Sequence, residues 1–126
     1  MKIVRVGPWY APEPATAHWT PAADVWETPE AYHIDLDVPA LRADAVEVTV
    51  EHGVLTVAGE RPEREQEATE KVHRRERRAG RFSRRFRLPE AADPDNVSAR
   101  VVDGVLELTI AKHATERPRR IEVIAA

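Results

Sequence analysis

Apolar and polar residues alternate with a period of two along the middle of the chain. Residues 32–38 read Tyr-His-Ile-Asp-Leu-Asp-Val, and residues 46–51 read Val-Glu-Val-Thr-Val-Glu. The alternation recurs, with one interruption, within residues 82–88, 97–101 and 106–110. Because neighbouring side chains of a strand point to opposite faces, this pattern predicts half-buried antiparallel strands. Their spacing, with turn residues between them, indicates an all-β chain folded as a β-sandwich.

Two glycines mark tight turns between predicted strands. His52-Gly53 and Asp103-Gly104 each separate two valine-rich segments. Glycine adopts a positive φ at no steric cost, which suits the two-residue turn of a β-hairpin. We therefore expect Gly53 and Gly104 to close two hairpins.

Proline density divides the chain into three parts. Residues 1–22 contain four of the ten prolines, which excludes regular helix and central strands and predicts an extended N-terminal arm. Residues 23–113 form the predicted sandwich, and residues 114–126 form a polar, proline-marked C-terminal extension. The arm also carries three large aromatic residues: Trp9, Tyr10 and Trp19.

Composition excludes several classes of function. Nineteen basic and twenty-two acidic residues leave a net charge of −3, which argues against a dedicated binder of nucleic acid or membrane surfaces. The chain has no cysteine, so it can form neither a disulfide scaffold nor a thiolate–zinc site. No apolar run approaches the roughly 18 residues of a spanning helix, and proline breaks the N-terminus before a signal peptide could form. We expect a cytoplasmic protein without a membrane segment.

The glycines and histidines give no sign of catalytic or cofactor chemistry. The five glycines form neither a P-loop nor a dinucleotide-binding fingerprint, which disfavours ATP-driven action. The five histidines are isolated and lack the spacing of metal ligands. The prediction is a protein that is not an enzyme and needs no cofactor or metal.

A strongly charged stretch separates two predicted strands. Residues 60–70 carry five glutamates, whereas residues 74–87 carry eight arginines and one acid. We interpret residues 60–80 as a long solvated loop with a short edge strand around Val72. Long loops in compact domains are usually functional or disordered. The arginines, interleaved with Phe82 and Phe86, could also bind single-stranded nucleic acid. The core phase of both phenylalanines and the adjacent glutamates disfavour that reading, and favour charge complementarity at a protein interface.

The C-terminal extension ends in aliphatic residues. Ile121 and Val123 project to the same side of an extended segment, so they can fill two adjacent apolar pockets while their backbone adds to a sheet edge. The alternative interpretation is a last core strand or a frayed terminus.

In this order and spacing, the motifs resemble the small heat-shock protein (α-crystallin) family, bacterial type, from about Asp24 onward. Residues 23–28 and 32–39 are similar to the opening strands of that family, and residues 46–61 to its central hairpin. Residues 99–106, Ala-Arg-Val-Val-Asp-Gly-Val-Leu, match its A-x-x-x-(x)-G-V-L signature, and Ile121-Glu122-Val123 matches its I-x-I/V tail motif.

The resemblance implies an immunoglobulin-like antiparallel β-sandwich with a long strand-exchange loop and flexible N- and C-terminal extensions. Dimers would form by exchange of the loop, and oligomers by docking of the tail of one subunit on another. The implied exchange-loop residues are Val72, Arg74, Arg75 and Arg77. The implied tail-docking groove consists of Val46, Val48, Val50, Val97, Ala99 and Val101.

The implied activity is that of an ATP-independent holdase, which binds partly unfolded proteins and suppresses their aggregation. Its partners would be non-native client proteins and further copies of itself. The client-binding arm would use Trp9, Tyr10 and Trp19, although this arm is shorter and richer in proline than is usual in the family. Two alternatives remain: a monomeric or dimeric adaptor of the co-chaperone type, and a nucleic-acid binder using the Arg74–Arg87 stripe.

Overall fold

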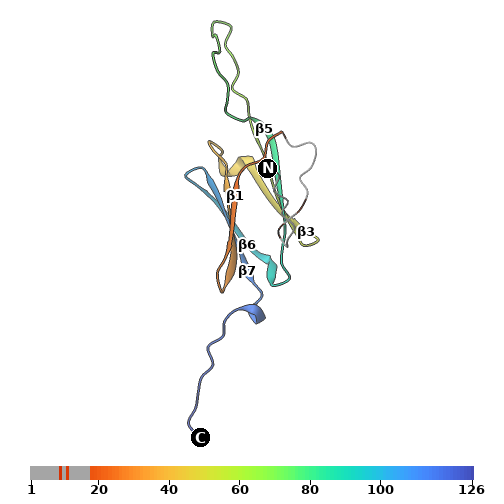
Figure 1. Cartoon of the computed structure of the whole chain (residues 1–126), viewed down its shortest axis with the longest axis vertical. Helices are drawn as coiled ribbons and strands as arrows, with labels where there is room; N and C mark the ends of the chain where they lie inside the picture. Colours follow the sequence, from red (N-terminus) through yellow and green to blue (C-terminus); the bar gives the residue numbers. More distant parts are fainter. Residues whose placement is uncertain (1–8, 10, 12–17) are drawn as a thin grey trace, which may run out of the picture.

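The computed structural model describes Trp9, Ala11 and residues 18–126, and within them two antiparallel sheets pack face to face as a β-sandwich (Figure 1). One sheet has the order β1-β2-β7-β6 and the other the order β3-β4-β5. The all-β prediction is therefore confirmed. The strands are β1 (Ala23–Glu27), β2 (Ala31–Asp37), β3 (Val46–Glu51), β4 (Val54–Arg61), β5 (Gly80–Arg87), β6 (Ala92–Val102) and β7 (Val105–Lys112). Two single-turn 3-10 segments are η1 (Ala43–Ala45) and η2 (Ala114–Glu116).

The apolar half of each alternating segment fills the space between the sheets. Along β2, Ile34 and Leu36 are fully buried, while Asp35 between them faces outward. Burying a side chain of this size stabilises the fold by about 1.5–3 kcal/mol. The other strand residues that are fully or almost fully buried are Leu55, Val57, Phe82, Phe86, Leu106, Leu108 and Ile110.

Both X-Gly turns have the backbone geometry of tight hairpins. His52 and Gly53, between β3 and β4, have φ angles of 52° and 74°. Asp103 and Gly104, between β6 and β7, have φ angles of 51° and 77°. Positive φ at both central residues defines a type I′ turn, whose twist matches that of the strands it joins.

The structure corrects the expected position of Trp19. This residue does not belong to an extended arm: its side chain is only 8% exposed and packs against Phe82, with ring centroids 5.0 Å apart. Its indole Nε1 donates a hydrogen bond to the carbonyl oxygen of Gly80 at 2.9 Å. Trp19 is therefore a core residue of this subunit.

Residues 18–22, which we call the N-terminal strap, hold Trp19 against the edge of β5. The backbone N–H of His18 donates to the carbonyl of Arg81 at 2.8 Å, and Trp19 forms a parallel bridge with Phe82. The Arg84 guanidinium donates to the carbonyl of Pro21 at 2.7 Å. Because the strap leads from β5 directly into β1, these two strands lie on one side of the sandwich. The edge strands β3 and β6 therefore share the other side.

Candidate functional site: an open valine edge, a charged loop and an exposed tail

The side of the sandwich formed by β3 and β6 is lined by valines that the core covers only in part. Val46, Val48 and Val50 pair with Gly59, Val57 and Leu55 of β4, so they face inward. On β6, Val97 and Val101 pair with the buried Ile110 and Leu106 and also face inward. All five valines are nevertheless only half-buried. We call this surface, together with Ala99, the valine edge.

Ala99 shows most clearly that the edge is open. It pairs with Leu108, which is 1% exposed, and it has the inward phase of its strand, yet Ala99 itself is exposed. An inward-facing residue remains exposed only where the opposite sheet does not cover it. Among the described strands, each of these two has a neighbour on one side only, so its outer edge is open to a further strand. The structure thus brings the six residues of the expected docking groove to one side of the sandwich.

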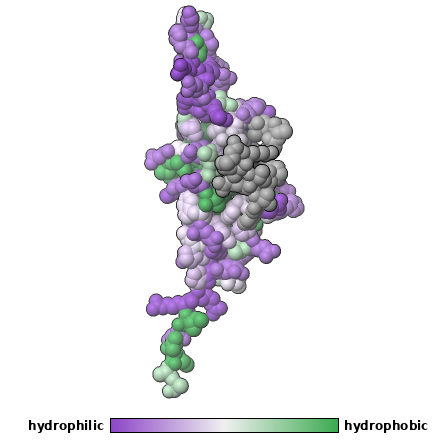
Figure 2. Space-filling model, in the orientation of Figure 1, coloured by the Kyte–Doolittle hydropathy of each residue, from purple (hydrophilic) through white to green (hydrophobic). Residues whose placement is uncertain are grey.

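The C-terminal tail, residues 117–126, extends away from the sandwich (Figure 1). It leaves β7 at Lys112, where the Arg117 guanidinium donates to the Lys112 carbonyl at 2.8 Å. Ile121 is 77% exposed and Val123 is 91% exposed. In Figure 2 the tail has a hydrophilic stem and a hydrophobic end. Such a cluster of fully solvated aliphatic side chains on a soluble surface typically marks an interaction site.

The tail is directed away from the valine edge of its own subunit. Lys112 pairs with Ala92, at the beginning of β6, whereas Ala99 lies seven residues further along that strand. The ladder is irregular between Ala92 and Val97, and Ala99 pairs with Leu108, which lies four residues before Lys112 on β7. At about 3.3 Å per residue, that separation is about 13 Å. The tail would have to reverse its direction to reach the valine edge of its own subunit.

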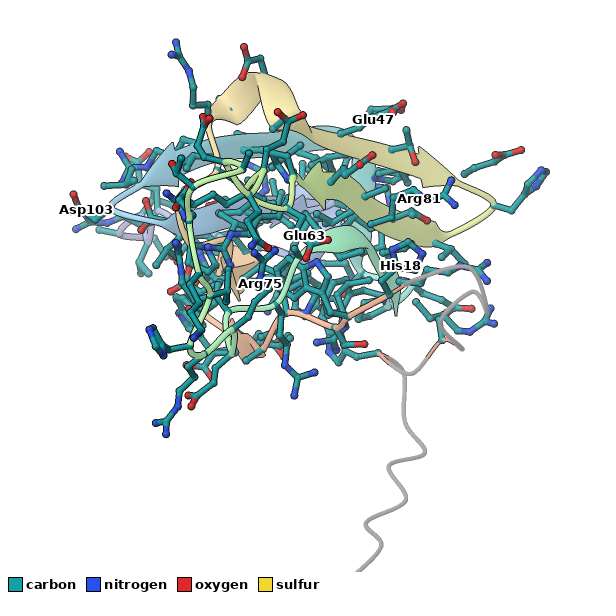
Figure 3. The ribbon with its side chains drawn as sticks, turned by 90° about the horizontal axis from the view of Figure 1, so that it is seen from above. His18, Glu47, Glu63, Arg75, Arg81 and Asp103 are labelled. Carbon is teal, nitrogen blue, oxygen red and sulfur yellow. The ribbon has the colours of Figure 1, made fainter. Side chains whose placement is uncertain are left out.

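The charged loop, residues 62–79, extends from the opposite end of the molecule and is almost entirely hydrophilic (Figures 1 and 2). Its two limbs are joined by ion pairs. Arg75 contacts the Glu63 carboxylate at 2.5 Å, and Arg64 contacts Glu70 at 2.7 Å. Figure 3 shows Glu63 and Arg75 directed toward each other.

Glu70 is the main polar junction of the charged loop. Its carboxylate accepts a hydrogen bond from the backbone N–H of Glu67 at 2.9 Å and another from Arg64. These two bonds, the backbone one first, lower the pKa of Glu70. Its contribution to loop order is therefore fully present above the ordinary carboxyl pKa and is lost as the pH falls through the lowered value.

No strand forms at Val72 within this single chain, so the edge strand expected there needs correction. Val72 lies in irregular backbone, and its side chain is 39% exposed among charged neighbours. Of the other exchange-loop residues, Arg74 pairs with Glu76 at 3.3 Å, and Arg77 is exposed. Among the described residues, the segment around Val72 has no pairing strand in its own subunit.

A suitable edge exists at β1, which sequence reasoning did not single out. β1 pairs with β2 on one side, and no described strand pairs with its other side. Val25 has the inward phase, opposite Ile34, yet it is 36% exposed. Trp26, on the outer face, is 44% exposed and stacks on His33 with ring centroids 5.2 Å apart. This edge can be recognised only from the strand order, which places β1 at the end of its sheet.

The remaining arm residues have different positions. Trp9 packs edge-on against Tyr32, with ring centroids 5.3 Å apart, and Tyr10 lies outside the described residues.

Sequence reasoning also missed Lys112, a lysine that is buried at the end of β7. Its Nζ contacts the Glu27 carboxylate at 2.6 Å, and this hydrogen bond is the main reason that the pKa of Lys112 is raised.

The described residues offer little support for other chemistry. Phe82 and Phe86 are each 2% exposed, so neither can stack on a nucleic-acid base. Within Trp9, Ala11 and residues 18–126, no three carboxylate or histidine side chains converge as a metal site would require. No helix of that part of the chain is long and apolar enough to cross a membrane.

Comparison with known proteins identifies the family. Residues 24–124 match the sequence model of the Hsp20/alpha crystallin family. The chain belongs to the Hsp20/alpha crystallin family. The matched residues include β3 and β6, the charged loop and residues 121–123 of the tail.

Individual relatives of this Hsp20-family chain agree. It is 45% identical over 105 residues to the 18.1 kDa class I heat shock protein of Oryza sativa, covering 82% of this chain and 65% of the relative. It is 39% identical over 119 residues to Spore protein SP21 of Stigmatella aurantiaca, covering 94% of this chain and 70% of that protein. A small heat-shock protein from Xylella fastidiosa, with a crystal structure described as a distinct high order structure, superposes with a TM-score of 0.74 at 39% identity. That match covers 86% of this chain and all of the Xylella chain.

Proposed function

We propose that this chain is an ATP-independent holdase chaperone that binds partly unfolded proteins and suppresses their aggregation. One observation carries the proposal: a single chain presents both an open valine edge and an exposed aliphatic tail that cannot easily reach it. Each subunit is thereby a donor and an acceptor, which generates an assembly of many copies. Family membership and the absence of phosphate-binding motifs from the sequence support the same function.

The proposed tail contact is weak enough to dissociate readily. Burying Ile121 and Val123 gains roughly 1.5–3 kcal/mol each, whereas the loss of translational and rotational freedom costs at least about 4 kcal/mol. A single contact is therefore weak, and it persists only because many such contacts act together. Release of a tail uncovers the valine edge, an apolar surface with unpaired backbone groups that can take up an exposed segment of a client.

Dimers, in this proposal, form by exchange of the charged loop. The segment around Val72 adds to the free edge of β1 on a partner subunit, where the exposed Val25 supplies an apolar contact. This pairing gives the loop the strand that it lacks in the single chain. It also covers an edge that would otherwise invite uncontrolled aggregation.

The chaperone activity is tested with a thermolabile enzyme heated alone or with an excess of this chain. We expect light scattering from the aggregating enzyme to fall in proportion to the added chain, to the same extent with and without ATP. Bovine serum albumin at equal mass is the control for non-specific crowding. Undiminished scattering, or suppression that requires ATP, would contradict the proposed function.

Tail docking predicts that the double substitution Ile121→Ala and Val123→Ala reduces the particle mass to that of dimers and leaves the fold intact. Removing most of the buried area of the contact leaves too little free energy to offset the cost of association. Native mass spectrometry measures the mass, and circular dichroism checks the fold. The matched control is Ile124→Ala, which alters a residue of opposite phase. An unchanged mass of the double variant would show that the tail does not dock.

Loop exchange predicts that a chain with residues 62–79 replaced by the dipeptide Asn-Gly cannot form the dimer. Arg61 and Gly80 are paired partners on β4 and β5, so a two-residue turn can close this hairpin without disturbing the sandwich. We expect the shortened chain, carrying also the two tail substitutions, to sediment as a folded monomer. If it still sediments as a dimer, the charged loop does not build the dimer interface.

A further inference from the structure

The outer face of the sheet β3-β4-β5 has a shallow depression of about 520 Å³ where β3 begins. Its floor consists of the small side chains of Ala58 and Ser83, which face outward opposite Glu47 and each other. Three carboxylates and one guanidinium line it: Asp44, Glu47, Glu60 and Arg81. The surface is therefore net acidic, and it meets the valine edge at Val46, which lines the depression as well. Figure 3 shows Glu47 and Arg81, from the two outer strands of this sheet.

The other side of the valine edge has no such character. The outward-facing residues of β6 near Ala99 are Ser98 and Arg100, and Arg100 is paired with Glu107 of β7 at 2.7 Å. A basic segment that entered the valine edge would thus be attracted to β3 and not to β6.

The tail carries such a segment directly before its aliphatic residues. Arg119 and Arg120 precede Ile121, both are exposed, and no described carboxylate pairs with either of them. In an extended chain, Arg120 projects to the side opposite Ile121 and Val123, whereas Arg119 shares their side. If Ile121 and Val123 face the valines, Arg120 faces outward, in the same layer as Glu47.

We propose that this depression is the receptor for Arg120 of a second copy of the chain, and that it fixes the direction in which the tail docks. The proposal rests on the tail docking put forward above. The tail runs parallel to β3, with Arg120 beside Glu47, Ile121 beside Val48 and Val123 beside Val50. Glu122 then lies beside the uncharged Thr49.

The opposite direction would place Arg120 at the other end of β3, beside Glu51. That end offers less attraction, because Glu51 is the only carboxylate of β3 there and its Oε1 already lies 3.4 Å from Nε2 of the adjacent His52. At the beginning of β3, by contrast, three carboxylates share one depression with one guanidinium. Asp44 is engaged only by a distant contact with Arg42, at 4.0 Å between exposed groups. The charge distribution therefore selects the parallel direction.

The test compares two glutamates at opposite ends of the same strand. Glu47→Lys places a positive charge beside the depression, and Glu51→Lys makes the same change at the other end of β3. Mixing two fluorescently labelled pools of each variant gives the rate of subunit exchange. Because one exposed charge pair changes an association constant by about two- to fivefold, we expect Glu47→Lys to accelerate exchange by about that factor or more. Glu51→Lys should leave the rate near that of the unaltered chain.

Charge swapping shows whether the contact is direct. Arg120→Glu should accelerate exchange as Glu47→Lys does, and the chain that carries both substitutions should regain a rate near the original one. Arg119→Glu is the matched control on the tail, because this side chain has the inward phase and should have the smaller effect. All four positions are exposed, so the thermal unfolding midpoint of each variant should stay unchanged.

Each outcome separates this inference from the proposed function. A larger effect of Glu51→Lys than of Glu47→Lys would overturn the parallel direction. A swapped chain that exchanges as fast as the single variants would overturn the direct contact. Both results leave tail docking itself standing if the Ile121→Ala and Val123→Ala chain still loses particle mass. If that double variant keeps its mass, the proposed docking fails and the inference fails with it.

Discussion

The proposed assembly depends on one side of the sandwich, which the described strands of this chain leave open. β3 and β6 are the edge strands of their sheets, and both have inward-facing valines that the opposite sheet leaves partly exposed. The other side is covered differently, because the N-terminal strap pairs with β5 and inserts Trp19 into the core. An unpaired strand edge beside apolar side chains invites another chain to bind. The fold therefore leaves an open apolar edge where the described strands of the two sheets end.

The valine edge and the C-terminal tail have complementary properties. A tail with Ile121 and Val123 exposed to water is costly unless it has an apolar destination, and the valine edge has the alternation of a strand that could receive it. The gain from burying two side chains, roughly 3–6 kcal/mol, is of the same size as the cost of association, at least about 4 kcal/mol, so the proposed contact must be repeated to last. A cover of this kind can leave when non-native protein competes for the same surface. In the proposed function, subunit assembly and client binding are two uses of the valine edge.

Much of the core could be predicted from the sequence, because strict alternation assigns each side chain of a strand to one face of the sheet. Ile34, Leu36, Leu106 and Leu108 are buried as their phase requires. The same phase identified the valines of β3 and β6, but it could not show that they remain half-exposed. That property depends on which strands end each sheet, and the order of strands is a matter of long-range pairing that a period of two does not encode.

Trp19 shows the opposite kind of limit. Dense proline predicts an extended arm, but it does not prevent a short segment such as residues 18–22 from pairing with an edge strand. A Cβ on Gly80 would clash with the His18 side chain, and Gly80 has a φ of 101°, so glycine at position 80 favours the close approach of the strap to β5. No local pattern around Trp19 signals that partner, which is 61 residues away. The strand expected at Val72 is absent because no strand of the described residues pairs with that segment.

The most direct test of the central claim is a photo-crosslinking measurement on the assembled protein. A photoreactive amino acid replaces Ile121, and subunits labelled with heavy isotopes are mixed with unlabelled ones so that mass spectrometry separates crosslinks between subunits from those within one. The account predicts crosslinks between subunits, concentrated on residues 46–50 and 97–101. Crosslinks confined to one subunit, or spread over the outer faces of the two sheets, would contradict it.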